Sequence, residues 1–257
     1  MSFSPIAIIP VYNHPDTIGA MVAGVRHAGL PCVLVDDGSD ARCAAVLQAL
    51  AQQPPEEKQT AVQYVRLPVN QGKGAAMMAG LTLAHRQGYS HALQIDADGQ
   101  HACDDIPLML ALAAAQPQAM VCGVPIYDAS VPKGRLYGRY LTHIWVWINT
   151  LSLDIRDSMC GFRVYPLAPC VAVLQRARLG RRMEFDSEVL VRLHWAGVPI
   201  VNLPTRVAYP QDGLSHFKVW RDNVLISGMH ARLFFGMCLR APWLLWRRWT
   251  RTGRSAI

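Results

Sequence analysis

Short apolar runs alternate with helix-like segments through the first half of this chain, and polar residues follow most of the runs. The segments between the runs, residues 16–27, 41–52, 73–86 and 104–115, have the spacing of helices. Such alternation predicts βαβ units and an α/β fold built on one mostly parallel sheet. The predicted strands are residues 6–11, 32–35, 62–67, 92–95 and 119–124.

Carboxylates and an amide follow three of these strands. Asn13 follows the first, Asp36 and Asp37 end the second, and Asp96 and Asp98 follow the fourth. Ligands of open parallel sheets bind beyond the carboxyl ends of the strands. The sequence therefore predicts a polar binding site at this edge.

The second half is less regular, and we expect it to form the substrate side of the same fold. It has predicted helices at residues 136–152 and 185–195 and predicted strands at 162–165 and 199–203. With no internal repeat and no long linker, we expect one domain over residues 1–216. Residues 217–257 form a C-terminal appendage to it.

Composition narrows the class of protein. Hydrophobic residues make up 51% of the 257 residues, enough for a sizeable core. The seven cysteines are scattered without a CxxC pair, which disfavours a disulfide framework or a structural zinc site. The first residues lack a basic segment typical of a signal peptide. A reducing, cytoplasmic setting fits these features.

The net charge of +7 lies in the C-terminal appendage. Residues 218–257 hold eight lysines and arginines against the single acid Asp222, so residues 1–217 are close to neutral. A neutral body with a basic tail favours an acidic surface as partner and disfavours a nucleic-acid-binding protein.

The appendage also has the pattern of an interfacial helix. Leu225, Met229 and Leu233 recur at helical spacing, while arginines leave no clean apolar span of about 20 residues. Trp243 and Trp246 stand close to further arginines. We therefore expect a helix on an anionic membrane surface. A helix packed on the body and an oligomer contact are the alternatives.

Known nucleotide and calcium motifs fail in this chain. It has no GxxxxGK[ST] sequence, and no GxGxxG follows the first strand. Asp96-Ala97-Asp98-Gly99 begins like a calcium loop, but His101 and Pro107 would occupy its sixth and twelfth positions. Two interpretations remain: a divalent ion held by Asp96, Asp98 and Gln100, or a polar turn that ends a strand.

Four motifs in this order resemble family 2 glycosyltransferases of the GT-A fold. They are IPVYN (9–13), VDDGSD (35–40), NQGKGAAMMAG (70–80) and DADGQH (96–101), and two later segments, 157–165 and 185–204, extend the similarity. The branch that looks most similar is that of the polyprenyl-phosphate and dolichyl-phosphate sugar synthases. The resemblance covers roughly residues 5–216.

The resemblance implies a nucleotide-sugar donor, with UDP or GDP, and a bound Mg²⁺ or Mn²⁺. Asp96, Asp98 and Gln100 would hold the metal against the donor diphosphate. A later loop with Gly213, Ser215, His216 and Lys218 would close over the phosphates. A helix cap at Asp37 and Ser39, a plain helix start at Lys73 and a flexible connector at 209–223 are the structural alternatives. The donor-binding residues would be Pro10, Tyr12, Asn13, Asp36, Asp37, Lys73 between two glycines, Asp96 and Ala97.

The resemblance further implies inversion at the sugar and a lipid acceptor, most simply a polyprenyl phosphate. Such an anion needs no general base, whereas an acceptor hydroxyl would need one. Asp157 would be that base, with Glu188 or Asp186 as second choices. The catalytic residues would then be Asp98, Asp157 and Arg163, and the acceptor phosphate would meet Arg135, Arg139, Ser158 and Arg163.

Two other functions stay open at this point. One is transfer to a lipid hydroxyl in bacterial glycolipid or aryl polyene-type assembly. The other is an inactive relative that senses a nucleotide. The oligomeric state is not indicated, and for the enzyme we expect a peripheral location on the inner face of the cell membrane.

Overall fold

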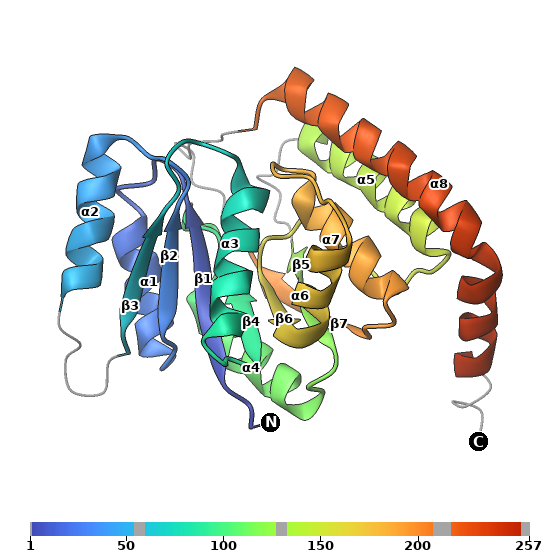
Figure 1. The fold of residues 1–257 in the computed structure, drawn as a ribbon, viewed down its shortest axis with the longest axis horizontal. Helices are drawn as coiled ribbons and strands as arrows, with labels where there is room; N and C mark the ends of the chain where they lie inside the picture. Colours follow the sequence, from blue (N-terminus) through green and yellow to red (C-terminus); the bar gives the residue numbers. More distant parts are fainter. Residues whose placement is uncertain (1, 54–59, 127–132, 208–216, 253–257) are drawn as a thin grey trace.

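The computed structural model describes residues 2–53, 60–126, 133–207 and 217–252, without the side chains of 133–137, 251 and 252. These residues form a seven-stranded sheet with helices on both faces (Figure 1). The strand order is β3-β2-β1-β4-β6-β5-β7. The strands are β1 (Pro5–Val11), β2 (Cys32–Asp36), β3 (Val62–Arg66), β4 (His91–Gln94), β5 (Met120–Ile126), β6 (Arg163–Pro166) and β7 (Ile200–Arg206).

The strand pairing confirms the predicted mostly parallel α/β sheet. All neighbours pair in parallel except β6, which runs antiparallel to both β4 and β5. Because β6 is reversed, the segment that leads into it reaches the edge where β1, β2 and β4 end. This reversal brings residues 157–162 to the edge where the sequence predicted a polar binding site.

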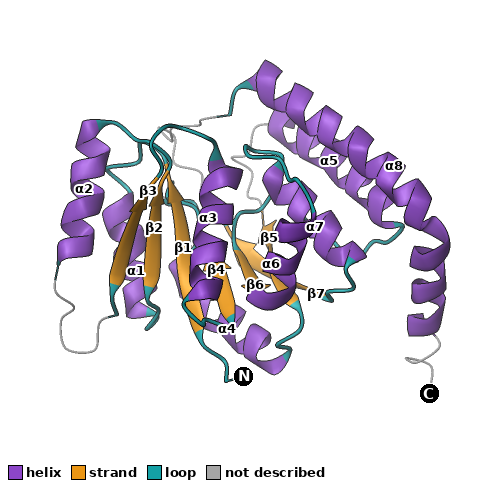
Figure 2. Ribbon diagram, viewed as in Figure 1, coloured by secondary structure: helices purple, strands orange, loops and turns teal. Residues whose placement is uncertain are grey.

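The helices cover both faces of the sheet, as Figure 2 shows. All helices predicted in the first half are present, and the helix expected at 136–152 begins earlier, at Lys133. Helix α6 was not predicted, because its ten residues follow β6 directly and no separate loop divides the two elements. The helices are α1 (Ile18–His27), α2 (Ala41–Gln52), α3 (Lys73–Arg86), η1 (Cys103–Asp105), α4 (Ile106–Ala115), α5 (Lys133–Thr150), α6 (Leu167–Arg176), α7 (Phe185–Trp195) and α8 (Val219–Thr252).

Two hydrophobic cores lie on opposite faces of the sheet, because alternate side chains of a strand point to opposite faces. In β1, Ile6 and Ile8 join a core with residues of α3, α6 and α7. Ala7 and Ile9 join the other core, with residues of α1, α2 and α4. A strand buried on both faces is typical of the centre of a parallel sheet.

Helix α8 packs on the catalytic body, which was the alternative to a free interfacial helix. Met229, Leu233, Met237 and Leu244 are buried and join the same core as α3 and α7. Among the described residues, Val219–Thr250 is nevertheless long and apolar enough to cross a membrane by length and composition, with 22% of the window buried. The expectation that no such span exists was wrong on that criterion. A core helix passes the same test, so the finding is weak evidence for a membrane.

Gly80 tests the packing of α3 on the sheet. A Cβ at this position would lie 2.6 Å from Cγ2 of the fully buried Ile8. We expect Gly80→Ala to lower the free energy of unfolding by about 1 kcal/mol or more, because overpacking outweighs the gain in helix propensity. Denaturant unfolding measures the change.

Gly19 in α1 is the matched control, since nothing lies within 4 Å of a Cβ built there. Gly19→Ala should leave stability unchanged or raise it by about 0.5–1 kcal/mol. An equal response of the two variants would contradict the close approach of α3 to β1.

Candidate functional site

The candidate site lies where β1, β2 and β4 end and where α3 and α7 begin. Lys73 is the first residue of α3, Asp96 follows β4, and Asp186 lies in the first turn of α7. Parallel pairing of the strands brings their carboxyl ends to one edge. Residues far apart in sequence therefore meet there, among them Lys73 and Asp96, which the resemblance placed at one donor diphosphate.

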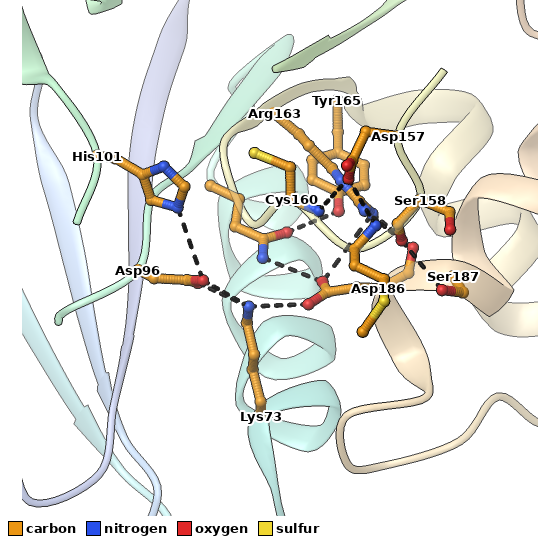
Figure 3. A network of polar contacts seen from close by, with 12 residues as sticks. Lys73, Asp96, His101, Asp157, Ser158, Cys160, Arg163, Tyr165, Asp186 and Ser187 are labelled. Atoms are coloured by element: carbon orange, nitrogen blue, oxygen red, sulfur yellow. Dashed lines mark hydrogen bonds and ion pairs between the residues drawn. The ribbon is translucent and has the colours of Figure 1, made fainter. Parts of the chain in front are cut away.

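Lys73 bridges two carboxylates (Figure 3). Its Nζ lies 2.7 Å from Oδ1 of Asp96, donates to Oδ2 of Asp96 at 2.8 Å, and lies 2.8 Å from Oδ2 of Asp186. The three side chains are 16%, 21% and 7% exposed. An ammonium and two carboxylates this far from water stabilise one another strongly.

The neighbouring charges fix the protonation of Lys73 and Asp96. Burial alone would lower the pKa of Lys73, but the carboxylates of Asp186 and Asp96 raise it above its ordinary value. Burial alone would raise the pKa of Asp96, yet Lys73 and His101 hold it well below its usual range. Lys73 is therefore a fixed cation and Asp96 a fixed anion at neutral pH.

A chain of hydrogen bonds extends this pair into the core. The Gln94 amide donates to Oδ1 of Asp186 at 3.1 Å, and the Tyr165 hydroxyl donates to Oε1 of Gln94 at 2.7 Å. Neither Gln94 nor Tyr165 was predicted as a site residue. Gln94 is a polar residue inside an apolar strand, and that was the signal in the sequence.

The residues that follow β4 form a turn. Ala97 and Asp98 form a turn, Gly99 has a φ of 75°, and the Gln100 N–H donates to Oδ1 of Asp98 at 3.0 Å. Burial raises the pKa of Asp98, and the charge of Asp96 raises it further. A carboxylate in such a position is stabilised by an added cation.

These residues fit a divalent ion only in part. Within the described ranges, no three His, Cys, Asp or Glu side chains gather as a metal site. Asp96 and Asp98 offer two carboxylates, which suits Mg²⁺ or Mn²⁺ when substrate phosphates supply the other ligands. The chemistry of this donor set therefore fits a metal that binds together with a diphosphate.

Gly161 allows the loop before β6 to lie against Asp96. A Cβ on Gly161 would lie within van der Waals overlap of the Asp96 carboxylate, 2.5 Å from its Cγ. His101 is close by, with its Nε2 at 3.9 Å from Oδ2 of Asp96 and its ring stacked on Phe162. His101 was not predicted as a site residue.

The first two aspartates of the VDDGSD motif hold neighbouring loops in place. Asp36 is fully buried, accepts hydrogen bonds from the Ser39 N–H and the Tyr64 hydroxyl, and pairs with Arg66 at 3.1 Å. Asp37 accepts from the N–H groups of residues 71 and 72, both at 2.7 Å, and burial raises its pKa. Their predicted contact with the base or ribose of a donor stays a prediction.

The other residues predicted to bind the nucleotide-sugar donor lie at the same edge of the sheet and differ in exposure. Pro10 is buried in β1, whereas Tyr12 and Asn13 are half-buried beyond its end. Asn13 has a positive φ of 54°, and its Oδ1 accepts from the Asp40 N–H at 2.8 Å. Ala97 is buried, and its carbonyl accepts from Thr17 at 2.6 Å. The cap of α2 is Asp40, which accepts from the Cys43 N–H, and not Asp37 or Ser39.

Asp157 is held in a cationic cluster. Arg139 donates to both of its oxygens at 2.7 Å, and Nε2 of His143 lies 3.3 Å from Oδ2. Burial alone would raise the pKa of Asp157, but His143 and Arg139 hold it well below its usual range. A carboxylate with so low a pKa is a weak base. His143 was not predicted as a site residue.

Arg163 and Ser158 are buried beside the loop before β6. Arg163 donates to the carbonyls of Asp186 and Ser158, at 2.6 and 2.9 Å, and is fully buried. The Ser158 hydroxyl is fully buried 3.0 Å from His143. These contacts position the loop before β6, and the predicted binding of an acceptor phosphate by both residues stays a prediction.

The remaining predicted residues divide into three groups. Glu188, a second choice of base, is buried, accepts from the Gly180 N–H and pairs with Arg192. The side chain of Arg135 lies outside the described residues, as do Gly213, Ser215 and His216. Lys218 is exposed at the start of the segment that leads into α8.

Comparison with known proteins identifies the family. The model of glycosyl transferase family 2 matches residues 6–177, more than half of the chain. The chain belongs to glycosyl transferase family 2. The matched residues include nearly all of β1, the Lys73 helix and the Asp96 turn, whereas Asp186 on α7 lies beyond the match.

Curated relatives of this glycosyltransferase include lipid-phosphate glycosyltransferases. The polyprenol monophosphomannose synthase of Mycolicibacterium smegmatis is 29% identical over 62% of this chain and 60% of its own length. The UDP-N-acetylglucosamine–dolichyl-phosphate N-acetylglucosaminyltransferase of Methanococcus voltae is 25% identical over 86% and 90%. The chain thus spans about 60% of the first relative and nearly all of the second.

Solved structures share the fold at low sequence identity. Glucosyl-3-phosphoglycerate synthase of Mycobacterium tuberculosis, crystallised with Mn²⁺ and UDP-glucose, matches with a TM-score of 0.63 and 13% identity over 91% of this chain and 79% of its own. TarS residues 1–349 of S. aureus with UDP-GlcNAc match with a TM-score of 0.61 and 13% identity over 90% and 66%. They confirm the GT-A-like architecture.

Gly161→Ala tests the contact between the loop and Asp96. The added methyl group would overlap the Asp96 carboxylate and displace it from Lys73. We expect glycosyl transfer to fall by at least about tenfold, because a displacement of about 1 Å in a site has such effects. Gly138→Ala, where nothing lies within 4 Å, is the control. Unchanged kinetics with an unchanged melting temperature would contradict this role of Gly161.

Asp157→Asn tests the cationic cluster through its pH dependence. The pKa of Asp157 is lowered in the folded chain, so its stabilising effect is full above its ordinary pKa of about 3.9. That effect is lost as the pH falls through the lowered folded pKa. The variant should be less stable by about 3 kcal/mol at neutral pH. The difference should shrink below about pH 4, as pH-dependent chemical denaturation can measure. A difference independent of pH would contradict the assignment.

Proposed function

We propose that the chain transfers a sugar, with inversion, from a UDP- or GDP-sugar to a polyprenyl phosphate at a membrane surface. The observation that carries the proposal is the Lys73 bridge beside the two carboxylates of the Asp96 turn. Relatives named for polyprenol, undecaprenyl and dolichyl phosphate support the choice of acceptor. We further propose residues 1–216 as the catalytic domain and the inner face of the cell membrane as its location.

Different residues at the sheet edge would act on different parts of the nucleotide-sugar donor. A divalent ion held by Asp96 and Asp98, with Gln100 beside them, would neutralise the charge that builds on the leaving diphosphate. Lys73 keeps Asp96 ionised and oriented through its bridge to Asp186. Tyr12 and Asn13 lie half-buried at the end of β1, where a nucleotide could pack.

The state of Asp157 favours a phosphate acceptor over a hydroxyl. A hydroxyl must lose a proton to a base, and Asp157 is already paired with Arg139 and His143. A lipid phosphate is an anion that attacks without a base. Arg135 and Arg139, which the sequence assigns to the acceptor phosphate together with Ser158 and Arg163, would then bind it. Transfer to a lipid hydroxyl is therefore the second candidate.

A screen of sugar nucleotides with polyprenyl phosphate and Mg²⁺ or Mn²⁺ tests the proposal. We expect a lipid-linked product that mild acid releases, since a sugar phosphate is acid-labile and a simple glycoside is stable. A product stable to mild acid would instead support the hydroxyl acceptor. No transfer from any donor to either acceptor would overturn the proposal.

Asp98→Ala tests the metal assignment. Loss of one of two carboxylates should weaken Mn²⁺ binding in the presence of the nucleoside diphosphate by more than about tenfold and abolish metal-dependent turnover. Asp104→Ala is the control, because Asp104 is an exposed carboxylate six residues away. Undiminished Mn²⁺ binding by the Asp98 variant, followed by calorimetry, would contradict the assignment.

A further inference from the structure

Helix α8 is apolar on two opposite faces. Its inner face packs on the body through Met229, Leu233 and Leu244. On its outer face, Phe235 is 70% exposed and Leu239 is 85% exposed. A helix that is apolar all round is expected to be covered on both sides. The outer face therefore lacks a cover within the described residues.

The outer strip of α8 has no charge along most of its length. Positions 224, 231, 235, 242, 246 and 249 follow one another at intervals of seven, four, seven, four and three residues, so they share one side of the helix. All six are apolar, and four of them are Val224, Phe235, Trp246 and Trp249, each exposed. An uncharged strip of this length is typical of a surface that leaves water.

The arginines of α8 turn toward the body. Arg247 donates to the carbonyls of His194 and Trp195 at the end of α7, and Arg248 donates to the Leu151 carbonyl. Arg232 lies 3.6 Å from Glu188, and Arg240 lies over the Trp195 ring. These contacts turn the arginines away from the apolar strip, while the side chains of Arg232, Arg240 and Arg248 still reach solvent.

Helix α5 continues the exposed apolar strip. Leu141, Ile144, Trp145 and Ile148 are exposed at helical spacing on one side of α5. The ring of Trp145 lies 6.3 Å from that of Phe234, which lies 6.0 Å from that of Phe235. The two helices pack against each other along one flank of the molecule (Figures 1 and 2). We call Leu141, Trp145, Ile148, Phe235, Leu239 and Trp246 the α5–α8 face.

The charges around this face favour a lipid surface over a second copy of the chain. Helix α5 contains no acid, and the single acid of α8, Asp222, is buried. Arg221, Arg232 and Arg248 remain exposed around the strip. A symmetric dimer would bring these like charges together, whereas anionic headgroups would neutralise them. Exposed tryptophans are also typical of the membrane interface.

We propose that the α5–α8 face docks the protein on a bilayer that contains anionic lipids, by burying its apolar side chains at the level of the headgroups. The choice of a lipid partner rests on the proposed function, and the surface extends that function to α5, inside the catalytic domain. Helix α5 also carries Arg139 and His143. Docking through α5 therefore places the Asp157 cluster beside the bilayer in which a lipid acceptor would lie.

Single substitutions on each helix test the face. Leu239→Gln on α8 and Leu141→Gln on α5 should each weaken binding to phosphatidylcholine–phosphatidylglycerol vesicles several-fold, and together by more than about tenfold. Leu108→Gln is the matched control, because Leu108 is 51% exposed on α4, outside this face. Binding should persist in about 1 M salt, where the Debye length is roughly 3 Å. Vesicle flotation with the full chain measures the binding of each variant and the binding in high salt.

Cys238 offers a second readout in the native chain. It is the one exposed cysteine of the seven and lies on α8 next to Leu239, while Cys103 is half-buried and the others are buried. A polarity-sensitive fluorophore on Cys238 should shift to the blue when the vesicles are added. Cys238→Ser treated in the same way should show no shift.

Two results would overturn the proposal. One is wild-type vesicle binding by both leucine variants without a blue shift at Cys238. The other is a dimer in vesicle-free solution that Leu239→Gln converts to monomer, because a second copy would then cover the face. Transfer to a detergent-dissolved polyprenyl phosphate should stay unchanged in the leucine variants. If the leucine variants lose vesicle binding but the wild-type chain transfers sugar to no acceptor, the docking face is supported and the proposed function is refuted.

Discussion

The arrangement of the site depends on one buried cation held between two carboxylates. A charge removed from water is stable only when it is paired and hydrogen-bonded, so Lys73 requires both Asp96 and Asp186. These residues begin α3, follow β4 and begin α7. Their pairing fixes the relative position of three elements. Gly74 and Gly161 make the approach possible, because a side chain on either would overlap its neighbours.

The same bridge would leave the proposed metal site incomplete by itself. Asp96 already shares its charge with Lys73, and of the two carboxylates Asp98 has the raised pKa that an added cation would lower. A protein site with two carboxylates and a nearby ammonium holds a divalent ion weakly, and phosphate oxygens would complete it. On this argument the proposed donor and metal would bind together, which would tie the assembly of the site to the presence of substrate.

The sequence predicted the elements well and the partners of its charges poorly. Apolar periodicity located β1 and α7, and the resemblance to family 2 glycosyltransferases placed Lys73 and Asp96 at the same donor diphosphate. The partners of Arg163 were not predicted, because tertiary packing buries it against two carbonyls. The pairing of Arg247 with the end of α7 joins residues more than fifty positions apart. Such long-range pairs have no local signal.

Helix α7 links the site around Lys73 to helix α8. Asp186 and Glu188 lie in its first turn, where the helix dipole stabilises anions, and the guanidinium of Arg247 binds the carbonyls at its last turn. Asp186 holds Lys73, while Arg247 belongs to α8 and its apolar outer face. A shift of α8 at a lipid surface would therefore act on the end of α7 opposite to Lys73. Because α7 is almost wholly buried, the close-packed side chains around the whole helix would have to accommodate a displacement of its last turn.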